Sequence, residues 1–148
     1  MRNLLREEAE ERARLLEVTS YEIDLDLTAE EDFGSAVVIR FACRRPGATS
    51  FVELDGTPLE VSLNGRDLGT AIDGNRIALP DLAADNELRV VARGAWSRTG
   101  EGLHRFTDPA DGLVYVWAQS FLDDAQRSFA CFDQPDLKAA FDLTVDAP

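Results

Sequence analysis

A Ser/His/Asp or Cys/His arrangement for nucleophilic catalysis would need a histidine, and this 148-residue chain has one. His104 is the only histidine, and Cys43 and Cys131 are the only cysteines. Because a catalytic thiol needs a neighbouring base, a pair of Cys131 and His104 is an arrangement that could do this chemistry. Neither residue lies in a sequence context that indicates activation. We therefore interpret the cysteines as two buried free thiols and His104 as a structural residue.

Carboxylates are the second group that could do chemistry, as metal ligands or as an acid and a base. Asp24 and Asp26 would point to the same side of a strand, and Asp123 and Asp124 are adjacent. The chain has 28 acidic and 15 basic residues, so paired surface acids are expected without any function. A divalent cation would need further oxygen ligands. The chain has no H-E-x-x-H, G-x-S-x-G or glycine-rich phosphate motif, so its residues predict no catalytic or metal site.

The formal net charge of −13 also limits the partners. Such a surface repels phosphate backbones, so we expect no nucleic-acid partner. No apolar run reaches membrane-spanning length, and the N-terminal residues lack the continuous apolar region of a secretory signal. We expect a cytoplasmic protein without a membrane partner.

The elements that would position these residues are mainly strands. Apolar residues at helical spacing predict a helix over about 3–17, with Asn3 as its cap and an ion pair between Glu8 and Arg12. From residue 18 the apolar period changes to two, which predicts strands up to about residue 145. The predicted strands are 21–27, 33–43, 50–55, 59–65, 76–82, 86–94, 113–121 and 141–145.

Turn signals every 8 to 12 residues separate these strands, and Asn64-Gly65 is the strongest hairpin signal among them. This spacing predicts a mainly β fold, an antiparallel β sandwich or saddle-like domain with a short N-terminal helix. We expect residues 1–148 to form a single domain. Residues 95–112 lose the alternation, and we predict a long ordered loop there.

Two segments near the C-terminus stand out. Within the strand 113–121, alternation places Gln119 on the same face as Trp117 and Phe121. A polar amide on an apolar face must find hydrogen-bond partners or line a pocket. The following segment, FACFDQPDLKAA (129–140), contains a turn that Pro135 would fix and in which Asp133 could accept hydrogen bonds from backbone amides.

The stretch 102–145 resembles the N-terminal domain of zinc metallo-aminopeptidases of the aminopeptidase N (gluzincin) family. The opening NLLREEAEERARLLEVTSYEIDLDLT is similar to the start of the actinobacterial branch of that family. The resemblance therefore covers essentially the whole chain. The positions that match are Gln119, Ala125, Arg127, Phe129, Cys131, Phe132, Asp133, Pro135, Lys138, Ala139 and Phe141.

The resemblance implies roles for several residues of this stretch. Asp133 and Pro135 would belong to a structural joint where the β domain meets a catalytic domain, with the phenylalanines 129, 132 and 141 anchored in the core. Gln119 would line the substrate pocket beside the scissile bond. Phe121 occupies the pocket position where the family has an acid that helps to hold the α-amine of the substrate, and a phenyl ring cannot bind an ammonium group by charge.

The resemblance further implies a non-catalytic, apparently truncated domain that shapes the substrate pocket of a zinc metallo-aminopeptidase. Without the zinc motif this chain alone should be inactive, with no cofactor of its own. Zinc is expected only in a missing catalytic domain of the same polypeptide, and the N-terminus of a peptide is the expected substrate. The alternative is a stand-alone binding module that kept the fold without peptidase activity. A third hypothesis is an inert fragment that associates with itself through an exposed β edge.

Overall fold

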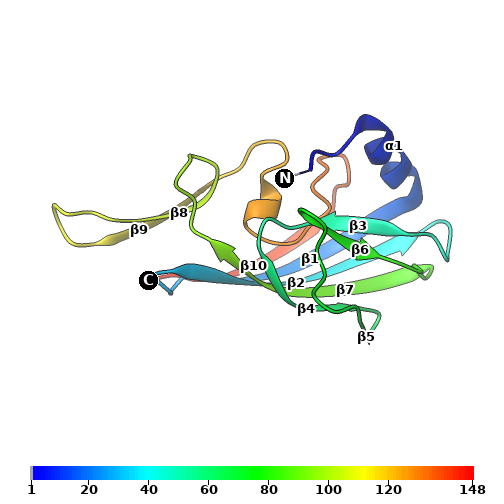
Figure 1. Cartoon of the computed structure of the whole chain (residues 1–148), viewed down its shortest axis with the longest axis horizontal. Helices are drawn as coiled ribbons and strands as arrows, with labels where there is room; N and C mark the ends of the chain where they lie inside the picture. Colours follow the sequence, from blue (N-terminus) through cyan, green and yellow to red (C-terminus); the bar gives the residue numbers. More distant parts are fainter. Residues whose placement is uncertain (1) are drawn as a thin grey trace.

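The computed structural model describes residues 2–148 and shows a mainly β molecule with a short helix near its N-terminus (Figure 1). The predicted fold class is therefore confirmed. The elements are α1 (Arg6–Leu15), β1 (Leu16–Asp26), β2 (Asp32–Cys43), β3 (Ser50–Glu53), β4 (Thr57–Leu63), β5 (Arg66–Asp67), β6 (Arg76–Leu79), β7 (Asp85–Ala95), β8 (Gly102–Thr107), β9 (Val114–Gln119), the 3-10 turn η1 (Ala125–Arg127) and β10 (Ala140–Asp146).

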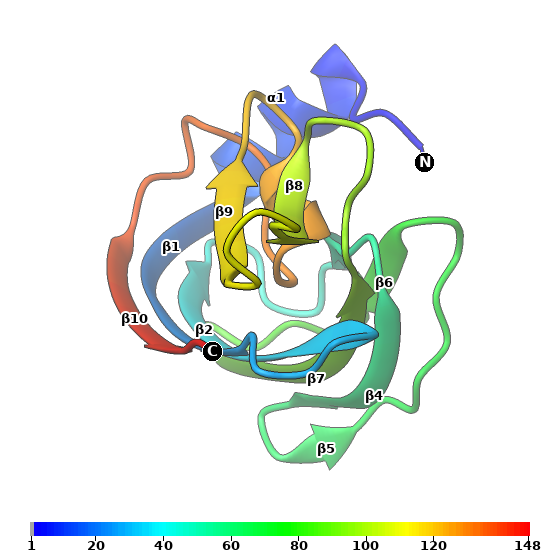
Figure 2. The same cartoon turned by 90° about the vertical axis from the view of Figure 1, so that its left-hand side faces the viewer.

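The strands form one large sheet and two small ones. The large sheet has the order β10-β1-β2-β7-β4-β5 and curves strongly, as Figure 2 shows. All its neighbours are antiparallel except β10, which lies parallel to β1 at one edge. The pair β3–β6 lies over the large sheet (Figure 1), and β8–β9 form a separate hairpin.

The core lies on the inner face of the large sheet, where alternate residues of each long strand are buried. In β1, Tyr21, Ile23 and Leu25 are buried while Asp24 and Asp26 are exposed, as the alternation predicts. The predicted turn between β4 and β5 is also present, with φ values of 53° at Asn64 and 76° at Gly65.

The prediction of a long loop over residues 95–112 was wrong. Residues of β8 pair with β9 in an antiparallel register that runs from Gly102 opposite Gln119 to Thr107 opposite Val114. A turn closes the hairpin, in which the amide of Gly112 donates to the carbonyl of Asp108 (2.7 Å). The hairpin projects from the rest of the molecule (Figure 1), so most of its side chains face solvent and its strands lack clear alternation of polar and apolar residues.

The helix was predicted in the right place, but its polar contacts differ from those expected. It begins at Arg6 rather than near Asn3, and the Glu8 carboxylate accepts a hydrogen bond from the amide of the capping residue Leu5 (2.9 Å). Glu8 and Arg12 do not pair with each other. Glu8 binds Arg76 (2.7 Å), and Arg12 points into the protein.

Candidate functional site

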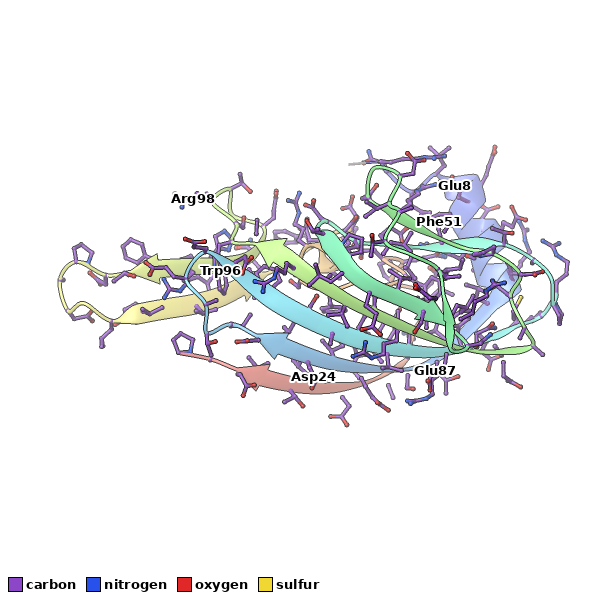
Figure 3. The ribbon with its side chains drawn as sticks, turned by 60° about the horizontal axis from the view of Figure 1, so that its bottom comes forward. Glu8, Asp24, Phe51, Glu87, Trp96 and Arg98 are labelled. Atoms are coloured by element: carbon purple, nitrogen blue, oxygen red, sulfur yellow. The ribbon has the colours of Figure 1, made fainter. Side chains whose placement is uncertain are left out.

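Gln119 is the last residue of β9, and its exposed side chain lines a groove of about 1080 Å³. The groove lies between the loop after β1, the segment after β7 and the hairpin. Figure 3 shows Trp96 and Arg98 at this end of the molecule, away from Glu8 and Phe51 near α1. Other residues that line the groove include Glu30, Glu31, His104 and Trp117.

His104 and Trp117 form one wall of this groove. Their rings stack with centroids 5.0 Å apart and planes 6° apart. The amide of Gly100 donates to His104 Nε2 (3.1 Å), and His104 Nδ1 lies 3.2 Å from the carbonyl oxygen of Gly102, to which it can donate. The ring is buried and both of its nitrogens have backbone partners. His104 therefore fixes the wall against the loop that precedes β8 and is poorly placed to serve as a base.

Cys131 lies in the core, where its backbone forms a bridge with Glu53. Burial raises the pKa of the Cys131 thiol well above its ordinary value, so the thiol remains protonated at neutral pH. Cys43 is also buried and free, which confirms the interpretation of two buried free thiols.

Phe121 is not in the same hollow as Gln119. β9 ends at Gln119, so the strand alternation that would place both residues on one face stops there. Phe121 is 72% exposed and lines a second hollow of about 450 Å³, together with Phe129, Leu137 and Phe141. The predicted shared face of Gln119 and Phe121 was therefore wrong.

The segment with Asp133 and Pro135 follows η1 and packs against the core through Phe132. The ring of Phe132 is buried and meets Phe41 edge to face, with centroids 5.2 Å apart. The carboxylate of Asp133 accepts a hydrogen bond from the amide of Gln126 (3.1 Å). Desolvation raises the pKa of Asp133 above its ordinary value. Pro135 is exposed in the turn that follows.

Phe141 corrects one expectation for this segment. It was predicted to anchor the turn in the core, but it is 60% exposed on the edge strand β10. Its ring stacks on Tyr21 with centroids 4.7 Å apart. The parallel register places Phe141 opposite Tyr21, and no further strand covers this edge among residues 2–148.

A buried ion pair connects the same segment to α1. Arg12 Nη1 lies 2.9 Å from Glu53 Oε2, and both side chains are at most 3% exposed. Arg12 Nε donates to Gln134 (2.9 Å), and Glu53 accepts from the amide of Asp133 (3.1 Å). Loss of one partner would leave an uncompensated buried charge. The sequence carries no local signal for this pair, because its members are 41 residues apart.

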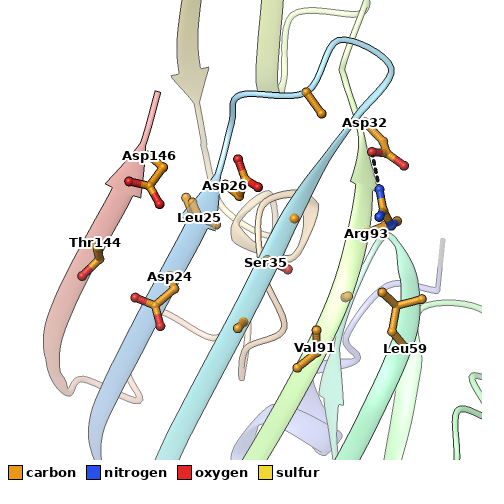
Figure 4. A pocket seen from close by; sticks show the side chains of 14 residues that line it. Asp24, Leu25, Asp26, Asp32, Ser35, Leu59, Val91, Arg93, Thr144 and Asp146 are labelled. Carbon is orange, nitrogen blue, oxygen red and sulfur yellow. Dashed lines mark hydrogen bonds and ion pairs between the residues drawn. The ribbon is translucent and has the colours of Figure 1, made fainter. Parts of the chain in front are cut away.

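A third hollow lies on the outer face of the large sheet, and Figure 4 shows it from close by. Asp24, Asp26 and Asp146 line it, and Arg93 binds Asp32 at one side (2.7 Å). Over the described part of the chain, no group of three or more histidine, cysteine, aspartate or glutamate residues could hold a metal ion. The described residues therefore offer no set of ligands of the kind that holds zinc.

The fold is shared with part of a known zinc metallopeptidase and with part of a known LTA4 hydrolase. The M1 zinc metallopeptidase from Deinococcus radiodurans matches 90% of this chain with a TM-score of 0.68 and 20% identity, and this chain covers 33% of it. Yeast LTA4 hydrolase matches 98% with a TM-score of 0.78 and 17% identity, and 27% of that chain is covered. At these identities the likeness shows the fold alone.

Sequence comparison is more specific. No family model matches the chain. Aminopeptidase N of Streptomyces lividans is 52% identical over an alignment of 153 residues that covers 99% of this chain. A probable M1 family aminopeptidase of Encephalitozoon cuniculi is 35% identical over an alignment of 115 residues that covers 66% of this chain. The chain belongs to the M1 aminopeptidase family and corresponds to its N-terminal domain.

The chain spans 18% and 13% of the lengths of these two relatives. Among residues 2–148, no helix has the length and apolar character needed to cross a membrane.

Proposed function

We propose that this domain shapes the substrate groove of a zinc metallo-aminopeptidase, an enzyme that removes N-terminal residues from peptides, and that it has no catalytic activity alone. The observation that carries the proposal is the 52% identity with an aminopeptidase N over 99% of the chain. The described residues contain no group that fits zinc, so zinc would be held by a catalytic domain of the same polypeptide.

Gln119 is the residue that we propose to contact the substrate. Its side chain is exposed in the groove, and the wall beside it is held by the stacked rings of His104 and Trp117. An amide can donate to a carbonyl oxygen and accept from an amine or a peptide N–H. Gln119 therefore has the chemistry to bind the N-terminal residue of a peptide that lies in the groove.

Phe121 is proposed to take no part in binding the amine of the substrate. Its ring lines the other hollow, and a phenyl ring offers no negative charge. Glu30 and Glu31 line the same groove as Gln119, and their negative charge favours a cationic group there. Asp124 is unavailable for this role because it is buried and accepts hydrogen bonds from Phe121 and Arg127.

The exposed apolar side chains support a partner domain on the same polypeptide. Among residues 2–148, the large apolar side chains that are exposed lie, apart from Leu5 and Leu59, on the hairpin, on the loop that follows it and on β10. They are Phe106, Leu113, Tyr115, Trp117, Phe121, Leu122, Phe141, Leu143 and Val145. Surfaces of this kind on a soluble domain usually mark an interface. We propose Asp133 and Pro135 as the structural joint that fixes the loop beside this surface.

The test is a peptidase assay on the purified 148-residue chain and on a longer polypeptide from the same gene, each with and without added zinc. We expect zinc-dependent release of N-terminal residues only from the longer polypeptide. Zinc-dependent release by the 148-residue chain would overturn the proposal. Cleavage by neither protein would instead favour the stand-alone binding module, which the sequence comparison does not favour.

We further propose that the protein works in the cytoplasm. Its two cysteines are free and buried, which suits a reducing compartment. Fractionation of the source cells with an antibody against the domain tests this, and recovery outside the cytoplasmic fraction would contradict it.

A further inference from the structure

The base of the β8–β9 hairpin converges on one arginine. Arg127 Nε lies 3.0 Å from Asp124 Oδ1, and its two terminal nitrogens lie 3.5 Å from Glu101 and from Asp55. Glu101 immediately precedes β8, and Asp124 follows β9 after a short loop. Asp55 follows β3 in the body of the molecule. One guanidinium group therefore contacts both ends of the hairpin and the body to which the hairpin is attached.

The stem of Arg127 also occupies space that a glycine leaves free. Gly102 has a φ of 82°, and a Cβ atom added to it would lie 3.0 Å from Arg127 Cβ. Gly102 is the residue opposite Gln119 in the β8–β9 register. Arg127 therefore packs against Gly102, the residue of β8 that lies opposite Gln119 of β9.

Asp124 connects Arg127 to the backbone just after Gln119. While Asp124 Oδ1 accepts from Arg127, Asp124 Oδ2 accepts from the backbone amide of Phe121 (3.1 Å). Asp124 is 7% exposed, so these hydrogen bonds are largely shielded from water. The chain just beyond Gln119 is thus fixed by the same group that binds Arg127.

The hairpin has few other backbone attachments. The hairpin forms its own two-stranded sheet, separate from the large one. An isolated two-stranded hairpin is marginal in water. Its further backbone link is a bridge between Ser97 and His104, in which the amide of Ser97 donates to the carbonyl of Leu103 (2.7 Å). The direction of the hairpin therefore depends on contacts at its base.

We propose that Arg127 is a positioning residue that sets the orientation of the β8–β9 hairpin and so places Gln119 in the groove. The positioning of Gln119 for a substrate rests on the function proposed above. The orientation of the hairpin does not, and it can be measured on this chain alone.

The first experiment compares hydrogen–deuterium exchange of the 148-residue chain and its Arg127→Met and Arg127→Lys variants. Arg44→Met is the matched control, because Arg44 forms a surface ion pair with Glu17 that does not involve the hairpin (3.3 Å). We expect Arg127→Met to speed exchange of the amides in β8, β9 and Phe121 about five-fold, with the amides of β2 and β7 unchanged. Arg127→Lys should restore part of the protection from exchange. Arg44→Met should leave the exchange rates of the hairpin amides unchanged.

Unchanged exchange in the hairpin of Arg127→Met would overturn the proposal, because the ion pairs would then contribute nothing to its orientation. Equal acceleration in the hairpin and in the large sheet would also overturn it, since Arg127 would then act on global stability alone.

The second experiment measures peptide hydrolysis by the longer polypeptide carrying the same variants. We expect Arg127→Met to raise KM by a factor that is about five times the factor by which it lowers kcat. Arg127→Lys should recover part of the lost kcat/KM. Hairpin loosening with unchanged kinetics would overturn the positioning of Gln119 and leave the orientation of the hairpin supported. Absence of hydrolysis in the unsubstituted polypeptide would refute the proposed function, while the exchange result would still decide the role of Arg127.

Discussion

At the scale of single residues, Gln119 carries the proposed contact with substrate. Replacing Gln119 with alanine in the longer polypeptide would remove one hydrogen-bonding group, worth about 1 kcal/mol and so about five-fold in KM. The measurement is steady-state kinetics with a dipeptide substrate. Ser120→Ala, at the next exposed position, is the control. Equal kinetics for the Gln119→Ala variant and the unsubstituted enzyme would refute the contact.

For Phe121, in contrast to Gln119, we predict that substitution has little effect on KM. Because its ring lines a different hollow from Gln119, Phe121→Glu should change KM for peptides less than about two-fold. A several-fold fall in KM would show that position 121 does reach the amine of the substrate. Such a result would mean that the loop after β9 takes another conformation in the complete enzyme.

Glu8 gives a prediction about pH. Its hydrogen bonds with Arg76 lower the pKa of Glu8 from 4.5 to about 2. Because the pKa of the folded state is the lower one, the stabilisation is fully present above about pH 5 and is lost as the pH falls from 4.5 towards 2. With its side chain 24% exposed, Glu8 should contribute about 2 kcal/mol at neutral pH.

Urea unfolding of the chain and of Glu8→Gln from pH 7 to pH 3 measures this contribution. The difference between the two proteins should be constant down to about pH 5 and shrink below it. A difference that does not change with pH would contradict the role given to the Arg76 contact.

At the scale of elements, the glycine of β7 that packs beneath Phe33 gives a sharp test of the core. A Cβ atom added to Gly94 would lie 2.1 Å from the ring of Phe33, which is buried and cannot move away. Gly94→Ala should therefore destabilise the protein by about 3 kcal/mol. Gly34→Ala in β2 is the control, because its added Cβ would meet Asp26 Cβ at an ordinary 3.5 Å. Equal denaturation midpoints for the two variants would contradict this packing.

How far the sequence predicts each element depends on how it is buried. The strands β1 and β2 were predicted because each buries one face, which leaves an alternating pattern. β8 was missed because the hairpin projects into solvent and its pattern is weak. The burial of Arg12 could not be predicted, since its partner Glu53 is distant in sequence. Gln119 was singled out because it lies on an apolar face of a predicted strand and because of the family resemblance. Its separation from Phe121 could not be predicted, since it depends on where β9 ends.

At the scale of the whole molecule, the exposed apolar surface predicts weak self-association of the isolated chain. The side chains of Phe141 and Leu143 on β10 lie at an edge that no other strand covers in the described part of the chain. The double variant Phe141→Ser/Leu143→Ser should therefore associate less at high concentration, as measured by sedimentation equilibrium. A chain that is monomeric at millimolar concentration, with or without these changes, would contradict an interface on this face.

The most direct test of the central claim is to sequence the gene beyond the codon for Pro148. We predict that the reading frame continues into a domain with an H-E-x-x-H motif, which would supply the zinc site that the described residues lack. A stop codon directly after Pro148 would contradict the proposed function, because the chain would then have no catalytic domain to which its groove could belong.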